Sequence, residues 1–124
     1  RQRQMCIRDR IKTVLASTDT VDTLIFDEVD TGISGSAAEK VGLKLREVSK
    51  SSQVLCVTHQ AQIAALADSH YLIRKQVEKG RTFTNVTLLD HNGRAGELAR
   101  IIGGVDITDA ALKHAESMLE KYNN

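Results

Sequence analysis

Two short apolar runs, each followed at once by polar residues, constrain the fold of this chain most. Residues 23–26 lead into Asp27 and Glu28, and residues 54–57 lead into a polar pair that includes His59. Neither run alternates apolar with polar residues, which is typical of strands buried on both faces of a parallel sheet. The sequence therefore predicts an α/β fold.

The segment between the two runs predicts a helix. Its apolar residues recur at spacings of four, four and three, and Ser36 with Glu39 has the spacing of a capping box. Those apolar residues are Ala37, Val41, Leu45 and Val48. A helical crossover makes the two strands parallel, so both end at the same edge of the sheet. Asp27, Glu28 and His59 are therefore expected to face one crevice, where open α/β sheets bind ligands.

The second half of the chain predicts a hairpin and more helices. Residues 63–67 favour a short helix, and residues 71–77 and 82–89 favour two strands joined by a tight turn. We expect this hairpin to lie at the edge of the same sheet. Helical periodicity marks residues 94–102 and 108–122 as two C-terminal helices. The predicted fold therefore has parallel strands with a crossover helix, a terminal hairpin and two C-terminal helices.

Length and charge exclude several classes of protein. The 124 residues suffice for one domain or less. No apolar run approaches the about 20 residues that cross a bilayer, so we expect a cytoplasmic chain with no membrane partner. Residues 1–10 carry a charge of +3, and the remainder, with 13 basic and 15 acidic side chains, carries −2. A weakly acidic body has no electrostatic footprint for nucleic acid.

The cysteines and histidines do not form a metal motif. Cys6 and Cys56 lie in dissimilar contexts, and Cys56 sits in an apolar run, as expected of a small buried hydrophobic residue. The four histidines are too far apart for the paired spacing of a zinc site. They are His59, His70, His91 and His114. The sequence predicts neither a disulfide nor a zinc site.

A buried strand that ends in Asp-Glu suits nucleotide hydrolysis, because the first carboxylate can hold Mg²⁺ and the second can orient water. Residues 23–35 read TLIFDEVDTGISG, and residues 57–68 read VTHQAQIAALAD. These segments resemble the ATP-binding-cassette (ABC) ATPases, in the branch shared with chromosome-maintenance (SMC) proteins. More narrowly, they are similar to the RecN family of bacterial DNA repair proteins, and the resemblance extends from residue 11 to about residue 119.

The resemblance implies a role for each polar strand end. Asp27 matches the Walker B aspartate that holds Mg²⁺, and Glu28 matches the catalytic glutamate that activates the attacking water. His59 matches the switch histidine that contacts the γ-phosphate. Residues 30–35 match the D-loop, which in the family lies beside the nucleotide of a partner subunit. The nucleotide-binding residues implied in this loop are Asp30, Thr31, Gly32, Ser34 and Gly35.

The same resemblance implies an activity and its partners. The complete protein is expected to hydrolyse ATP with Mg²⁺ in a head-to-head dimer, and to act in recombinational repair of DNA double-strand breaks. DNA as a partner rests on the resemblance alone, as does a location at the bacterial nucleoid. Residues 11–124 correspond to the C-terminal part of the ATPase head, and residues 1–10, which have no apolar period, are expected to be non-native.

Two family motifs do not occur in the 124 residues: the phosphate loop G-x-x-x-x-G-K-[ST] and the L-S-G-G-E signature. The chain alone is therefore expected to be inactive. Two alternatives to an ATPase stay open. A non-catalytic structural or interaction module would keep the fold without hydrolysis. A DExD-type helicase motor matches residues 27–30, but such motors follow the next strand with a Ser-Ala-Thr-like element, where residues 57–59 here read Val-Thr-His.

Overall fold

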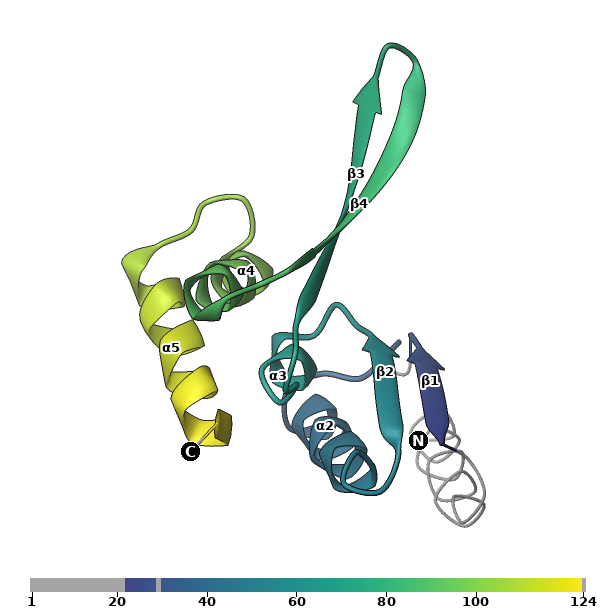
Figure 1. Cartoon of the computed structure of the whole chain (residues 1–124). Coiled ribbons are helices and arrows are strands. Elements are labelled where there is room, and N and C mark those ends of the chain that lie inside the picture. The colour runs from purple at the N-terminus through teal and green to yellow at the C-terminus, as the bar shows by residue number, and fades with distance from the viewer. Residues whose placement is uncertain (1–21, 29, 124) are drawn as a thin grey trace. The chain divides into compact units, whose positions relative to one another are not determined.

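The computed structural model describes residues 22–28 and 30–123, and the chain divides into two units between Leu66 and Ala67 (Figure 1). The first unit holds the parallel strands, and the second holds the hairpin and the two C-terminal helices. Residues 1–10, which are predicted from the sequence to be non-native, lie outside the described residues. Within the described part, no helix is both long and apolar enough to cross a membrane.

The first unit is a strand–helix–strand arrangement with a short helix after it. Its elements are β1 (Thr23–Asp27), α2 (Gly35–Val48), β2 (Gln53–Val57) and α3 (Ala61–Ala64). β1 and β2 pair in parallel, with Thr23 opposite Gln53 and Asp27 opposite Val57. The predicted parallel pairing, crossover helix and short helix are confirmed.

The predicted capping box at the start of α2 is wrong. The helix begins at Gly35, and Ser34 occupies the N-cap position without a capping hydrogen bond from its side chain. Ser36 therefore lies inside the first turn, where its hydroxyl is too late in the chain to act as the N-cap of this helix.

The core of this unit lies between α2 and one face of the two-stranded sheet. Its buried residues are Phe26, Ile33, Ala38, Leu45 and Ile63. Leu24 and Cys56 pack against this cluster, whereas the alternate strand residues Ile25 and Leu55 are 72% and 48% exposed. Successive strand residues point to opposite faces, and in the described structure the helices cover only one of them. The expectation that both faces of the strands are buried is therefore wrong for this structure.

The second unit begins with a β-hairpin. β3 (Tyr71–Glu78) pairs antiparallel with β4 (Arg81–Leu88) along its whole length. The two loop residues, Lys79 and Gly80, have φ angles of 48° and 76°, the left-handed conformation that the favoured two-residue hairpin turn requires. The predicted hairpin is confirmed. Its predicted place at the edge of the first sheet is wrong, because the described strands form two separate two-stranded sheets.

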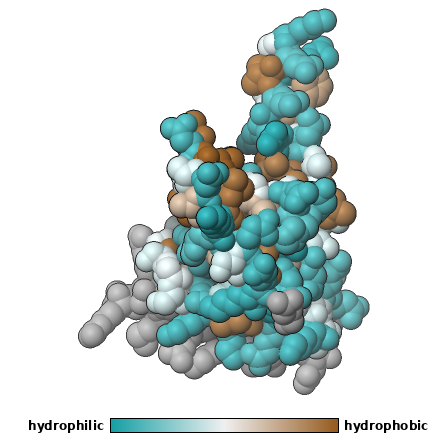
Figure 2. Space-filling view, turned by 90° about the vertical axis from the view of Figure 1, so that its left-hand side faces the viewer, coloured by the Kyte–Doolittle hydropathy of each residue, from teal (hydrophilic) through white to brown (hydrophobic). Residues whose placement is uncertain are grey.

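One face of the hairpin leaves apolar side chains exposed. Pairing places Tyr71 opposite Leu88 and Ile73 opposite Val86, on the same face as Val77. These five side chains are between 54% and 72% exposed. Figure 2 shows apolar side chains lying among hydrophilic ones along the hairpin. No element of the second unit covers this face within the described residues.

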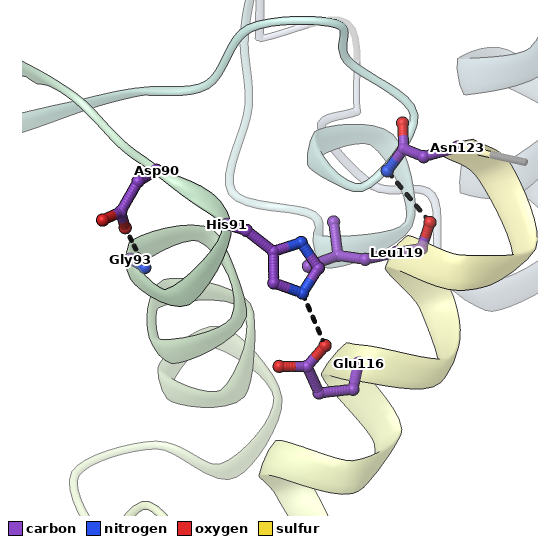
Figure 3. A network of polar contacts seen from close by, with 6 residues as sticks. All are labelled: Asp90, His91, Gly93, Glu116, Leu119 and Asn123. Atoms are coloured by element: carbon purple, nitrogen blue, oxygen red, sulfur yellow. Dashed lines mark hydrogen bonds and ion pairs between the residues drawn. The ribbon is translucent and has the colours of Figure 1, made fainter.

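The chain ends in two packed helices, as predicted. α4 (His91–Gly103) and α5 (Asp109–Asn123) contact each other, and Leu98 and Leu119 are almost completely buried in this unit. A hydrogen bond joins the helices, with His91 Nε2 placed 2.8 Å from Glu116 Oε2 (Figure 3). α4 begins three residues before the predicted start at residue 94, because Asp90 provides an N-cap that the apolar periodicity does not reveal.

The Asp90 cap gives a direct test of this unit. Its carboxylate oxygen Oδ1 accepts a hydrogen bond of 2.7 Å from the amide of Gly93. We expect Asp90→Ala to lower the free energy of unfolding by about 1 kcal/mol, the usual cost of losing such a cap. Urea denaturation followed by circular dichroism measures it. Asp106→Ala, which removes an exposed carboxylate from the loop between α4 and α5, is the control, and equal losses in both variants would contradict the assignment.

Candidate functional site

The parallel register brings the two polar strand ends to the same edge of the first sheet. Asp27 is paired with Val57, and the amide of Glu28 extends the ladder by donating to the Val57 carbonyl oxygen at 3.3 Å. Thr58 and His59 follow directly on β2. The side chains of Asp27, Glu28 and His59 are all exposed. The sequence-based expectation that these strand ends share one edge is confirmed.

Glu28 has an unusual backbone conformation at this edge. Its φ angle is 53°, in the left-handed region that a residue other than glycine adopts at a cost of about 1–2 kcal/mol. Its carbonyl oxygen accepts two hydrogen bonds from Thr31, at 3.3 Å from the amide and 2.9 Å from the hydroxyl. These bonds hold the turn that follows the strand. Strained backbone of this kind is common at functional sites, so the conformation of Glu28 supports its assignment as a candidate functional residue.

Asp30 links the loop after β1 to the segment after β2. Its side chain is only 6% exposed, and Oδ2 accepts hydrogen bonds from the Thr58 hydroxyl and from the His59 amide, the latter at 3.0 Å. A further bond of 3.2 Å runs from the Gln60 side-chain amide to the Ile33 carbonyl oxygen. Three hydrogen bonds therefore join residues 30–33 to residues 58–60.

Thr58 is fully engaged in this network. Its hydroxyl donates to Asp30 and accepts from the Gln60 amide at 3.0 Å. A hydroxyl has one proton to donate, so Thr58 has none left for a phosphate oxygen in this arrangement. The sequence reasoning missed this link. The sequence does contain a signal for this link: a carboxylate, Asp30, lies three residues after the end of β1, and a hydroxyl, Thr58, follows the end of β2 directly.

Apart from Ile33, which is buried in the core, the remaining D-loop residues lie on the surface. Thr31, Gly32, Ser34 and Gly35 are exposed. Gly32 and Gly35 have φ angles of 77° and 50°, and a Cβ atom at either position would meet no other atom within 4 Å. The loop is therefore open to an approaching molecule at these positions, whereas the Asp30 carboxylate is turned into the chain.

Cys56 lies below the strand ends, opposite Phe26 in the parallel ladder. Burial, together with the negative charges of Asp30 and Asp27, raises the pKa of its thiol to about 11. The neutral thiol packs against the core, so the expectation of a small hydrophobic residue is confirmed.

The exposed carboxylates fit the predicted metal. Among the described residues, Asp27 and Glu28 have no hydrogen bond or ion pair to their side chains, so their oxygens remain available. Mg²⁺ prefers oxygen ligands, and nucleotide sites often bind it through one or two carboxylates together with phosphate oxygens and water. The described residues hold no cluster of three or more His, Cys, Asp or Glu side chains that would bind a metal without such help.

Comparison with known proteins gives a consistent result. No family model matches the chain. It is 44% identical over 111 residues to the DNA repair protein RecN of Bacillus subtilis, which covers 90% of this chain and 19% of that protein. The RecN proteins of Deinococcus radiodurans and Vibrio cholerae are 48% and 43% identical over 109 residues, each covering 88% of the chain. This chain is similar in sequence to a segment of RecN.

The chain spans about a fifth of the length of the RecN proteins it matches. Its fold resembles a solved structure described as "Structural biochemistry of ATP-driven dimerization and DNA stimulated activation of SMC ATPases". The TM-score is 0.59 at 20% identity, and the match covers 77% of this chain and 56% of that one. The predicted resemblance to RecN is thus confirmed, and so is the predicted α/β fold, which this chain shares with part of that SMC ATPase structure.

The thiol of Cys56 provides a probe of the negative charges of Asp27 and Asp30 at the strand ends. In a Cys6→Ser chain, we expect the rate of Cys56 alkylation by iodoacetamide to keep rising through pH 10, because only the thiolate reacts and its pKa is about 11. Asp30→Asn removes one negative charge and should lower this pKa. The same chain in urea is the control and should titrate near about 8.5. A folded-state rate that levels off by pH 9 would contradict the assignment.

Proposed function

We propose that the protein containing this chain is an ABC/SMC-type ATPase that acts in recombinational repair of DNA double-strand breaks. The observation that carries the proposal is the parallel register. It sets the exposed Asp27 and Glu28 beside the segment of His59, within a sequence 44% identical to part of RecN. The name of those relatives supplies the link to DNA repair. A role in DNA repair would place the protein in the bacterial cytoplasm, at the nucleoid.

Each strand end has a separate task in this proposal. Asp27 would hold Mg²⁺, which would supply neutralisation of charge on the phosphate oxygens of ATP. Glu28 accepts a proton from the attacking water and so acts as general base. His59, whose ring is exposed while its amide is bonded to Asp30, contacts the γ-phosphate.

We propose that ATP is held between two copies of the complete protein. The exposed D-loop positions Thr31, Gly32, Ser34 and Gly35 are accessible to a second copy and its nucleotide. Asp30 contributes from within the chain instead. The SMC ATPase of similar fold is itself described as dimerising under the action of ATP. DNA is proposed as a partner of the complete protein and not of this chain alone. The weakly acidic body of this chain has no electrostatic footprint for nucleic acid.

The matches to RecN favour this proposal over a helicase motor. The non-catalytic module remains the competing outcome. Under our proposal the 124-residue chain alone hydrolyses no ATP, because no phosphate-loop sequence is present in it to bind the β- and γ-phosphates.

The decisive substitution is Glu28→Gln in the complete protein. We expect ATP turnover to fall by about 10²–10⁴-fold, the usual contribution of a general base, while binding of Mg-ATP stays within a few-fold. Steady-state hydrolysis and calorimetry measure the two quantities. Glu120→Gln, at an exposed position on α5, is the matched control and should leave both unchanged. Turnover by Glu28→Gln within a few-fold of the unsubstituted protein would instead support the non-catalytic module.

A further inference from the structure

We propose that Asp30 is a positioning residue, which holds His59 in register with Glu28 without touching the nucleotide. This inference rests on the proposed function, because it assigns Asp30 a part in the same site. It starts from a buried carboxylate. Asp30 is 6% exposed, and within the described structure it forms no ion pair. A buried carboxylate is stable in a protein interior only when hydrogen-bond donors satisfy its oxygens.

Both donors come from the other strand end. Oδ2 of Asp30 accepts the hydroxyl proton of Thr58 and the amide proton of His59, the latter over 3.0 Å. The bond to the amide fixes the backbone of His59 while leaving its ring exposed. Asp30 thus fixes the backbone from which the ring projects, and among the described residues neither ring nitrogen has a hydrogen-bond partner.

The loop that carries Asp30 is in turn attached to Glu28. Thr31, the next residue, donates two hydrogen bonds to the Glu28 carbonyl oxygen, at 3.3 Å and 2.9 Å. On the far side, Gln60 is bonded through its amide to Thr58 and through its side chain to Ile33. The strand ends are therefore joined by one continuous hydrogen-bonded loop, with the Asp30 carboxylate as its central acceptor.

This arrangement separates Asp30 from the exposed positions of the same loop. Three residues after it are exposed to solvent, namely Thr31, Gly32 and Ser34. In contrast, Oδ2 of Asp30 accepts hydrogen bonds from within the chain. A displacement of about 1 Å in a group that contacts the reacting phosphate is enough to cost up to about 100-fold in rate. Loss of Asp30 should therefore act on the chemical step through His59.

The test is a double-substitution cycle in the complete protein. We expect Asp30→Ala to lower kcat by about 10-fold to 100-fold, with KM for Mg-ATP within about two-fold. Asp30→Asn, whose amide oxygen can accept the same two bonds, should restore most of this loss. In a His59→Ala background, Asp30→Ala should change kcat by less than about two-fold, because the residue through which it acts is gone. Equal losses in both backgrounds would overturn the proposal in favour of a merely structural role.

A second measurement covers the case in which the His59→Ala protein is too slow to assay. In the ¹⁵N-labelled 124-residue chain, Asp30→Ala should speed hydrogen exchange of the His59 amide by about 10-fold or more, because its acceptor is lost. Thr58→Val, which removes only the hydroxyl donor, should leave that amide protected. The amide of Leu45 in α2 should keep its protection in both variants, which separates a local change from unfolding. An unchanged exchange rate at His59 in Asp30→Ala would overturn the proposal.

Glu28→Gln distinguishes the two levels of inference. If Glu28→Gln retains turnover, the proposed function fails, and the exchange measurement alone decides whether Asp30 positions His59. If Glu28→Gln is inactive while Asp30→Ala turns over ATP like the unsubstituted protein, the function stands and only the role of Asp30 is rejected.

Discussion

The parallel register of β1 and β2 is the constraint on which the rest of this structure depends. Because Thr23 is opposite Gln53 and Asp27 is opposite Val57, both strands end at the same level. A parallel pair cannot be closed by a tight turn, so the chain must cross over the sheet, and α2 makes that crossover while burying one face. A shift of one residue in this register would reverse the faces of a strand and remove Phe26 from the core.

Charge at this edge is arranged in two layers. Asp27 and Glu28 are exposed, where water and a metal ion can reach them, whereas Asp30 is buried and hydrogen-bonded to the opposite strand end. The carboxylates of Asp27 and Asp30, one from each layer, add to burial, the largest cause, in raising the pKa of the Cys56 thiol to about 11. Burying the Asp30 carboxylate costs desolvation free energy, because a charge removed from water must be compensated. A hydrogen bond between uncharged groups would join the two loops at a lower cost, so the carboxylate is expected only where its geometry is needed. Its position next to His59 provides such a need.

Local patterns in the sequence predict much of this fold. The apolar runs predict β1 and β2, and the Lys79-Gly80 pair marks the hairpin, because these features depend on neighbouring residues. Long-range features are harder to foresee. The burial of Asp30 depends on donors 28 and 29 residues further along the chain, and the exposure of Ile25 depends on which face the helices cover. The left-handed backbone conformation of Glu28 is equally hard to predict from the sequence, because it depends on a turn held by Thr31 and not on a propensity of glutamate.

The charge distribution also indicates what the site requires from elsewhere. No Lys or Arg occurs in residues 13–39 or 51–73, the segments that contain both strands, their polar ends and the loop that joins them to α2. The two exposed carboxylates, Asp27 and Glu28, would therefore face a triphosphate without a fixed positive charge from these segments. Like charges repel, and the repulsion is strongest where water is excluded. A nucleotide can bind stably at this edge only if Mg²⁺ and cationic or amide donors from another part of the complete protein, or from a second copy, neutralise its phosphates. Under the proposed function, the strand ends described here supply the metal ligand, the base and the γ-phosphate contact, while other segments supply the affinity.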